Sequence, residues 1–143
     1  MKPWGYDEMG IDYGGERMTN FEMVREFHRV FGQQVATVPT LAHRTVEQLR
    51  YDLIAEEFNE LDEALIDRNI VAVADALTDL AYVVYGMADI YGIDLDACFR
   101  EVHRSNMSKL GEDGKPILRA DGKFLKGTSY SPPDLKTILG INP

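Results

Sequence analysis

Acidic side chains in the middle of the chain are the first candidates for chemistry. Glu56, Glu57, Glu60 and Glu63 recur at spacings of three and four residues, so on a helix that advances about 100° per residue they gather on one face. Residues 51–67 contain no lysine or arginine. Like charges at this spacing repel by roughly 0.2–0.5 kcal/mol per exposed pair, so we expect a cation to compensate them.

Two more acids, Asp75 and Asp79, interrupt an almost wholly apolar segment at residues 69–91. A helix that is apolar on nearly every face is normally buried, and a buried, unpaired carboxylate is costly. We therefore expect both aspartates to be buried and to need a cation. This pair is a stronger indication of a metal site than the glutamates, which also suit a solvated helix face.

A chain reversal near Arg68 and Asn69 would bring the two acidic sets together. In such a hairpin Glu60 lies level with about Leu77, between the two aspartates. These segments contain no histidine or cysteine, and oxygen ligands select hard cations such as Mg²⁺ or Mn²⁺ over Zn²⁺. Bound ions of this kind favour hydrolysis of a phosphoanhydride.

Capping signals predict four main helices around these acids. Thr19-x-x-Glu22 begins a helix that runs towards Gly32, and Thr45-x-x-Gln48 begins a long one that ends near Arg68. Residues 69–91 form the third helix. Asp94 caps a fourth helix from Leu95 to about Leu110.

The two ends of the chain carry less regular structure. Residues 1–18 read as an irregular arm, which leaves 19–143 as one all-α domain. Asp113-Gly114 and Asp121-Gly122 predict a small hairpin or two linked turns in a turn-rich tail. Ser131-Pro132-Pro133-Asp134 predicts the start of a short last helix that ends at Leu139.

Composition limits the classes of function. The chain has 143 residues, 45% of them hydrophobic, which suits one domain, and its single cysteine excludes an intramolecular disulfide. A net charge of −9 argues against a nucleic-acid partner. We find no signal peptide and no stretch long enough to span a membrane, so we expect a cytoplasmic protein without a membrane partner.

Charge is unevenly distributed along the chain. Residues 50–101 hold thirteen acids and three bases, whereas residues 104–126 hold six bases and three acids. An acidic centre beside a basic tail suits a cation followed by a polyanion. Solvated helix faces are a commoner cause of such runs.

Three ordered motifs resemble the MazG-like family of all-α nucleoside triphosphate (NTP) pyrophosphohydrolases, which is related to phosphoribosyl-ATP pyrophosphohydrolases and dimeric dUTPases. The motifs are IAEEFNEL at 54–61, DALTDLAYVVYG at 75–86 and EVHRSNMSK at 101–109. The resemblance implies Mg²⁺-dependent cleavage between the α and β phosphates, with Mn²⁺ as a substitute. It also implies an antiparallel bundle of four main helices completed by a homodimer or higher homo-oligomer, and a house-cleaning role towards dUTP or other non-standard deoxynucleotides.

The family pattern also implies roles for individual acids. Glu56, Glu60 and Asp79 match the metal ligands, and Glu57 matches a ligand or the base that orients the attacking water. The family's second motif is commonly Glu-x-x-Asp, but Ala76 stands at its glutamate position. Asp75 is the acid nearest to that position, and it would either bind the metal directly or support the residues that do.

Candidate substrate contacts lie outside the acidic segments, with one exception. Asn106 and Lys109 resemble the family's nucleotide-contacting stretch. Tyr82 shares the sector of the aspartates and suits stacking on a base or hydrogen bonding to a ligand. Three cations of the tail suit clamps on the triphosphate almost as well as a solvated loop. They are Arg119, Lys123 and Lys126.

Two other readings compete with a pyrophosphohydrolase. Di-iron carboxylate bundles need Glu-x-x-His pairs, and none of His28, His43 and His103 has a glutamate three residues before it. A non-enzymatic helical interaction module would use the acidic face to dock a basic partner. Isolated histidines in such a chain are more often hydrogen-bonded packing residues than catalysts.

Overall fold

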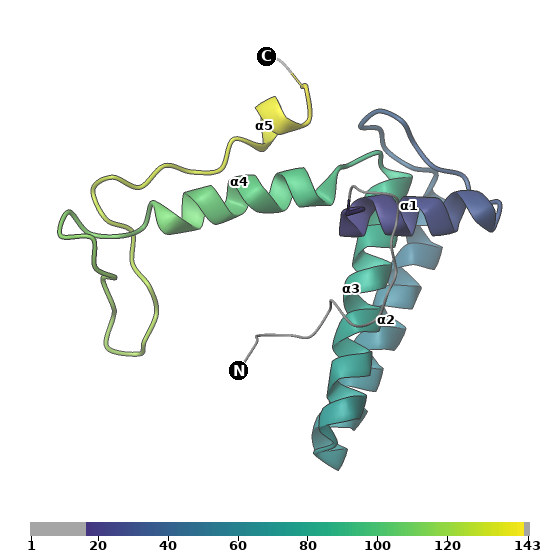
Figure 1. Cartoon of the computed structure of the whole chain (residues 1–143), viewed down its shortest axis with the longest axis horizontal. Coiled ribbons are helices and arrows are strands. Elements are labelled where there is room, and N and C mark those ends of the chain that lie inside the picture. Colours follow the sequence, from purple (N-terminus) through teal and green to yellow (C-terminus); the bar gives the residue numbers. More distant parts are fainter. Residues whose placement is uncertain (1–16, 142–143) are drawn as a thin grey trace.

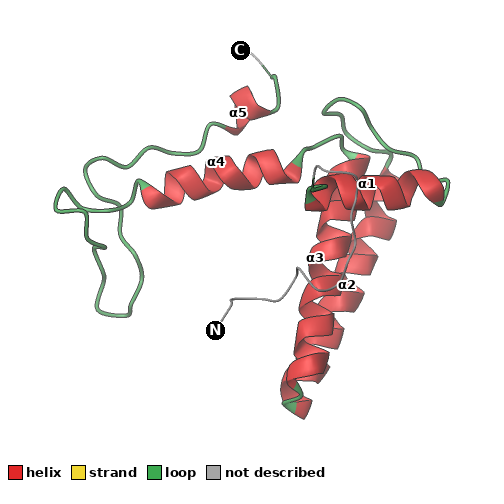
Figure 2. Ribbon diagram, in the orientation of Figure 1, coloured by secondary structure: helices red, strands yellow, loops and turns green. Residues whose placement is uncertain are grey.

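A computed structural model describes residues 17–141 and confirms the all-α class (Figures 1 and 2). The residues it describes contain no strand, only one isolated bridge between Leu118 and Phe124. Most of the arm predicted at 1–18 lies outside this range. The helices are α1 (Asn20–Val30), α2 (Arg44–Asp67), α3 (Ile70–Ile90), α4 (Leu95–Met107) and the short α5 (Leu135–Ile138).

The first capping box is confirmed and the second is wrong. At α1, the Thr19 hydroxyl accepts the Glu22 amide at 3.2 Å, and the Glu22 carboxylate accepts the Thr19 amide at 2.7 Å. At α2, His43 is the N-cap, and Thr45 lies inside the first turn. The Thr45 hydroxyl and amide both contact His43 Nδ1, so this imidazole takes the capping role that we expected of a threonine.

Helices α2 and α3 form the predicted antiparallel hairpin. Arg68 has a left-handed φ of 50°, and the side chain of Asn69 then caps α3, so the chain reverses within two residues. Buried Ala64 and Ala76 keep the two backbones close. The reversal places the two acidic segments side by side, as the sequence indicated.

Helix α1 crosses the hairpin near its open end and is held there by the buried Asp89. The Asp89 carboxylate accepts Arg25 Nε at 2.6 Å and His28 Nδ1 at 2.8 Å. Asp89 and His28 are 0% and 2% exposed, respectively. The prediction that His28 is a hydrogen-bonded packing residue is confirmed.

Helix α4 begins at the predicted cap, Asp94, and ends at Met107, earlier than expected. It extends away from the hairpin and packs on α1 and α5 (Figure 1). The sharp turn before it requires Gly92, whose φ is +68° and whose absent Cβ would lie 2.3 Å from the Val38 carbonyl oxygen. The four main helices of one chain therefore do not close into a bundle.

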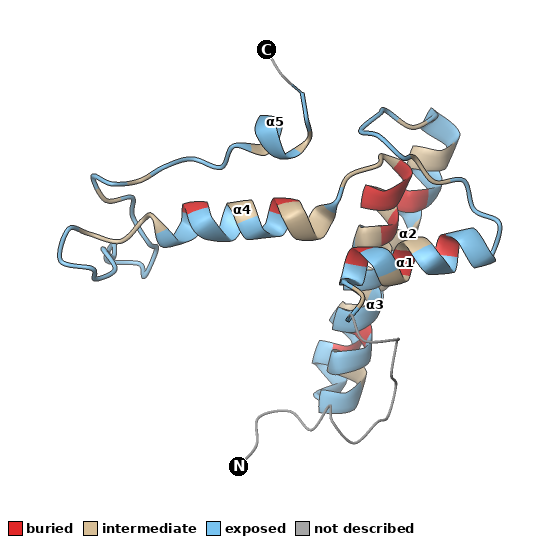
Figure 3. Ribbon diagram, turned by 45° about the horizontal axis from the view of Figure 1, so that its top comes forward, coloured by how far each residue is buried: buried red, intermediate tan, exposed pale blue. Residues whose placement is uncertain are grey.

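The predicted burial of α3 is wrong for the single chain. Only 11% of its most apolar 18-residue stretch is buried, and most of the hairpin below α1 is exposed (Figure 3). Contrary to our expectation, this helix of 21 residues is long enough to span a membrane, and its most apolar 18-residue stretch, with a mean hydropathy of 1.5, is apolar enough. Core helices of soluble proteins can be equally long and apolar. The cytoplasmic location stays a prediction.

Candidate active site

Glu57 is the centre of the acidic cluster. It lies on the side of α2 that faces α3, and its Oε2 atom is buried without a hydrogen-bond partner among the described residues. Burial raises the pKa of Glu57, and the charges of Glu60, Asp79, Glu56 and Asp75 raise it further. The four other predicted metal ligands therefore all act electrostatically on Glu57.

The two aspartates differ from our expectation. Asp75 and Asp79 are both exposed, because the face of α3 that carries them is not covered within one chain. Ala76 is buried against α2. Asp79 raises the pKa of Glu57 more than Asp75 does. The ligand roles of the two aspartates stay predictions.

These carboxylates fit a hard cation but do not form a ready-made cage. Within residues 17–141, no three acidic, histidine or cysteine side chains gather as a metal-binding group. Magnesium is usually held by only one or two carboxylates together with water and substrate phosphates. The feature that suits such an ion is the Glu57 oxygen, which has no hydrogen-bond partner among the described residues and belongs to a carboxyl group whose pKa is raised by the charges of four further acids.

The predicted phosphate contacts lie at the end of α4 and in the tail that follows it, away from the hairpin. Lys109 donates to Asn106 at 2.7 Å, and both border an apolar cavity of about 390 Å³ at the end of α4. In the tail, Arg119 pairs with Asp121, and Lys126 lies 4.3 Å above the Tyr130 ring. Lys123 shares the hairpin with Arg119. A single chain thus separates its basic set from its acidic set (Figure 1).

Sequence reasoning missed the aromatic row that joins Tyr82 to Phe27 and Phe27 to Phe31. The Phe27 ring meets Tyr82 edge to face at 5.7 Å, and Phe31 lies 4.3 Å from Phe27. Tyr82 stands one helical turn after Asp79. The four-residue spacing of Phe27 and Phe31 was the available signal, because it places both rings on one side of α1.

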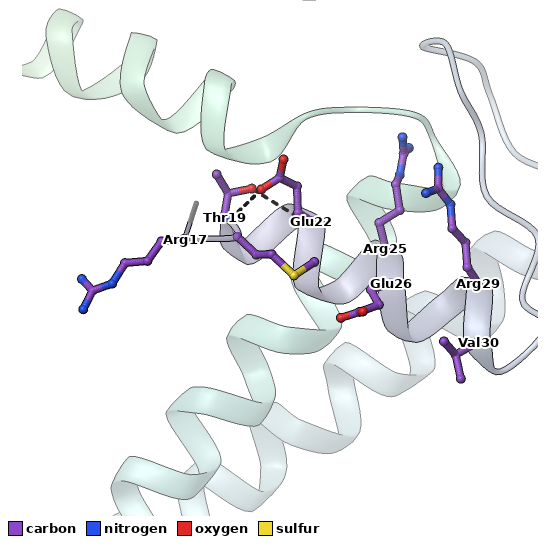
Figure 4. Close-up of a pocket in the computed structure, with 8 residues that line it drawn as sticks. Arg17, Thr19, Glu22, Arg25, Glu26, Arg29 and Val30 are labelled. Atoms are coloured by element: carbon purple, nitrogen blue, oxygen red, sulfur yellow. Dashed lines mark hydrogen bonds between the residues drawn. The ribbon is translucent and has the colours of Figure 1, made fainter. Parts of the chain in front are cut away.

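A wide hollow of about 950 Å³ lies along α1 but does not include the acidic cluster. Figure 4 shows Arg25 and Arg29 on one side of the helix and Glu26 on the other, with the capping pair at its start. Among the residues that the structure describes, no aromatic side chain lines this hollow. It is therefore separate from the predicted site.

Comparison with known proteins places the chain in a family. Residues 24–106 match the phosphoribosyl-ATP pyrophosphohydrolase family, a range that includes the acidic segments and ends before the tail. An uncharacterized protein of Acanthamoeba polyphaga mimivirus is 36% identical over 107 residues, which are 71% of this chain and only 39% of that protein.

A solved structure from Exiguobacterium sp. 255-15, whose name gives NTP pyrophosphohydrolase as a provisional activity, is 24% identical with a TM-score of 0.45. That match covers 85% of this chain and 92% of the other. The family match spans more than half of the chain and contains the first two motifs and most of the third. The chain belongs to the phosphoribosyl-ATP pyrophosphohydrolase family, within the MazG-like NTP pyrophosphohydrolase superfamily.

Proposed function

We propose that this protein is a Mg²⁺-dependent hydrolase that cleaves a nucleoside triphosphate between its α and β phosphates. The observation that supports this most directly is the buried Oε2 atom of Glu57, which has no hydrogen-bond partner among the described residues, in a carboxyl group whose pKa four other acids raise. Family membership supports a hydrolase acting on phosphoanhydrides. A fold that keeps so much unpaired negative charge together without a cation would lose stability for no gain.

The proposed reaction consumes one water and releases nucleoside monophosphate and pyrophosphate. The water oxygen bonds to the α phosphorus, the bond between that phosphorus and the α–β bridging oxygen breaks, and pyrophosphate leaves with the bridging oxygen. The water proton passes to a carboxylate oxygen. Glu57 is the candidate for orienting that water and accepting its proton, because within residues 17–141 its Oε2 atom has no hydrogen-bond partner. Glu56, Glu60 and Asp79 would hold the metal, with Asp75 beside them. A bound Mg²⁺ would supply charge neutralisation and polarise the phosphoryl oxygens.

The proposal includes a second copy of the chain. Helix α3 is apolar yet largely uncovered, and α4 extends away from the hairpin instead of closing a bundle on it. A partner subunit seated on the hairpin would bury that face. The end of the partner's α4 and the basic tail after it, the part of the chain that carries Asn106 and Lys109, would then be available to the acidic cluster. Such pairing of basic and acidic surfaces across an interface favours association, and the single chain keeps these surfaces apart.

The decisive experiment is a panel of common and modified nucleoside triphosphates, dUTP among them, assayed with Mg²⁺ and Mn²⁺. We expect pyrophosphate rather than free phosphate from at least one nucleotide, and loss of that activity in Glu57→Gln and Asp79→Asn. A house-cleaning role would appear as a preference for dUTP or another non-standard deoxynucleotide. Sedimentation should give a mass of at least twice 16.2 kDa.

The alternative function, a non-enzymatic module with an acidic docking face, makes the opposite prediction for the metal. It expects no rise in thermal stability on addition of Mg²⁺ or Mn²⁺, whereas a metal site stabilises the folded state that binds it. A folded wild-type protein that is neither stabilised by these ions nor active on any triphosphate would leave the docking module as the better account.

A further inference from the structure

The α2–α3 hairpin ends in an exposed apolar tip, which we define as residues 65–71. Its most exposed apolar side chains are Ile66, Ile70 and Val71, which are 79%, 79% and 73% exposed, respectively. Helix α1 crosses the hairpin at the opposite end and leaves the tip uncovered (Figure 1). Contiguous apolar surface of this kind usually marks a site of interaction.

The apolar cavity of about 390 Å³ at the end of α4 is a second such surface, which we call the tail cavity. Phe124 and Met107 line it and are 62% and 53% exposed, respectively, so apolar surface of the cavity is open to solvent. Ile117, Leu110 and Leu125 make up much of the remaining wall. The tip is a projection and the tail cavity is a hollow, so the two surfaces are complementary in form.

Backbone hydrogen bonds hold the walls of the tail cavity in place. The Leu125 amide donates to the Ile117 carbonyl at 2.8 Å, and the Gly127 amide donates to the Lys109 carbonyl at 3.0 Å. The chain passes so close to α4 here that a Cβ on Gly127 would lie 2.4 Å from the Leu110 carbonyl oxygen. The cavity is therefore preformed, and binding does not have to order its walls.

Charge favours a contact between the tip and the tail cavity. Residues 61–71 contain three acids, Asp62, Glu63 and Asp67, and one base, Arg68, and all three acids are exposed. Residues 109–126, which include most of the cavity lining, contain five bases and three acids. Opposite net charges beside two apolar surfaces favour their association and disfavour the contact of one tip with another.

The tip and the tail cavity of one chain lie apart, because α4 extends away from the hairpin and packs on α1 and α5 (Figure 1). A second copy of the chain offers both surfaces again. In a two-fold symmetric dimer, the tip of each copy would enter the tail cavity of the other, so one contact implies the second.

We propose that the tail cavity binds the hairpin tip of a second copy, with Ile66 and Ile70 packing against Phe124. This inference rests on the second copy in the proposed function and deepens it, because it names the surfaces that meet. Asp75 follows Ile70 by five residues, which is about 7.5 Å along α3. The contact therefore brings the partner subunit's Lys109, at the border of its cavity, towards the acidic cluster.

The direct test is a disulfide between copies, in a chain that carries Ile70→Cys and Phe124→Cys, with Cys98→Ala to remove the native thiol. Ile70 begins α3 and Phe124 belongs to the tail, and these parts of one chain lie apart (Figure 1). A disulfide between them must therefore join two copies. After mild oxidation, we expect a product of about twice 16.2 kDa on a non-reducing gel. Reduction should return it to the mass of one chain.

Leu41→Cys combined with Phe124→Cys is the matched control. Leu41 is more exposed than Ile70 but lies in the loop between α1 and α2. This pair, and each variant with a single cysteine, should give little covalent product under the same oxidation.

Ile70→Ser and Phe124→Ser measure the strength of the contact without a cross-link. Both residues are exposed in the single chain, so each variant should keep the circular dichroism of wild type. Each should raise the dissociation constant of the assembly at least about 10-fold in sedimentation, because that is the usual effect of burying one large apolar side chain. The double variant should raise it little further, because both changes remove the same contact.

The remaining outcomes overturn the inference. Cross-linking of the test pair that is no stronger than that of the control pair, or serine effects that add, would refute the contact of tip and cavity. The proposed function would survive either result if the wild type still assembles and releases pyrophosphate. Sedimentation of the wild type at 16.2 kDa would overturn both the second copy and this inference, whereas the triphosphate panel tests the hydrolase separately.

Discussion

Asp89 and Glu57 lie on the same helical hairpin in opposite electrostatic surroundings. Asp89, near the open end, is fully buried and accepts hydrogen bonds from Arg25 and His28. Glu57 faces α3 nearer the reversal, its buried oxygen has no partner among the described residues, and the charges of four acids raise its pKa. Donors from α1 satisfy Asp89, whereas no cation within residues 17–141 pairs with Glu57.

The difference separates a structural carboxylate from a functional one. A buried charge is tolerated when cations and hydrogen bonds surround it, as they do at Asp89. A cluster that lacks them is unfavourable to folding and persists for another reason, such as binding an ion that neutralises it. Substitution of the two residues should therefore change stability in opposite directions.

The largest expected effect is on catalysis, in Glu57→Gln. Removing the charge but not the shape should lower the rate of pyrophosphate release by about 10²–10⁴-fold, the usual contribution of a positioned general base. Without metal, the variant should be more stable than wild type by roughly 0.5 kcal/mol, because repulsion from its neighbours is relieved. Steady-state assays and urea denaturation in a chelating buffer measure the two effects.

Asp62→Asn is the control for that variant, since Asp62 is exposed and lies on the opposite flank of α2 by helical spacing. It removes the same charge and should leave activity near wild type. If Glu57→Gln were destabilised in the absence of metal, the contrast with Asp89 would fail.

Asp89→Asn should destabilise the fold by about 3 kcal/mol, because it leaves Arg25 without its charged partner. Urea denaturation at fixed protein concentration measures this loss. The metal-dependent gain in melting temperature should survive in the fraction that remains folded. A loss below about 1 kcal/mol would mean that the α1 crossing does not depend on this ion pair.

A finer comparison separates the two arginines near Asp89. Arg25 donates to Asp89 and to the Ala36 carbonyl, both at 2.6 Å, so Arg25→Met should cost about 2 kcal/mol. Arg50 is 8% exposed, its Nε has no partner among the described residues, and burial lowers its pKa despite Asp89. Arg50→Met should cost less than about 1 kcal/mol, because an apolar side chain there removes an unsatisfied donor. Equal losses in urea denaturation would contradict this ranking.

Local signals predicted the helices, and contacts between distant residues decided the rest. Thr19-x-x-Glu22, Asp94 and the reversal at Arg68 act within a few residues of their own position, so the sequence revealed them. His28 and Asp89 are 61 residues apart, and no periodic pattern links them. Burial of Asp75 and Asp79 was mispredicted because apolar composition does not say whether the cover comes from the same chain.

The smallest expected effect concerns the packing of α5 on α4. Polar contacts hold these two helices together, whereas the hairpin is held by apolar packing. Glu101 accepts Arg104 at 2.7 Å and the Asp134 amide at 2.8 Å. The Arg104 hydrogen bond and the Asp134 amide lower the pKa of Glu101 from 4.5 to about 2.

A lowered pKa means that this contact stabilises the fold fully above pH 4.5 and that its contribution is lost as the pH falls from there towards about 2. Hydrogen exchange of the α5 amides should therefore accelerate between these two pH values relative to amides in the hairpin, after correction for intrinsic rates. Glu101→Gln should show the faster exchange already at neutral pH, whereas Glu112→Gln, a change elsewhere in the tail, should not. Unchanged hydrogen-exchange protection of the α5 amides in Glu101→Gln would mean that apolar contacts also hold α5 on α4. The pair of helices would then differ from the hairpin only in lacking the acidic cluster.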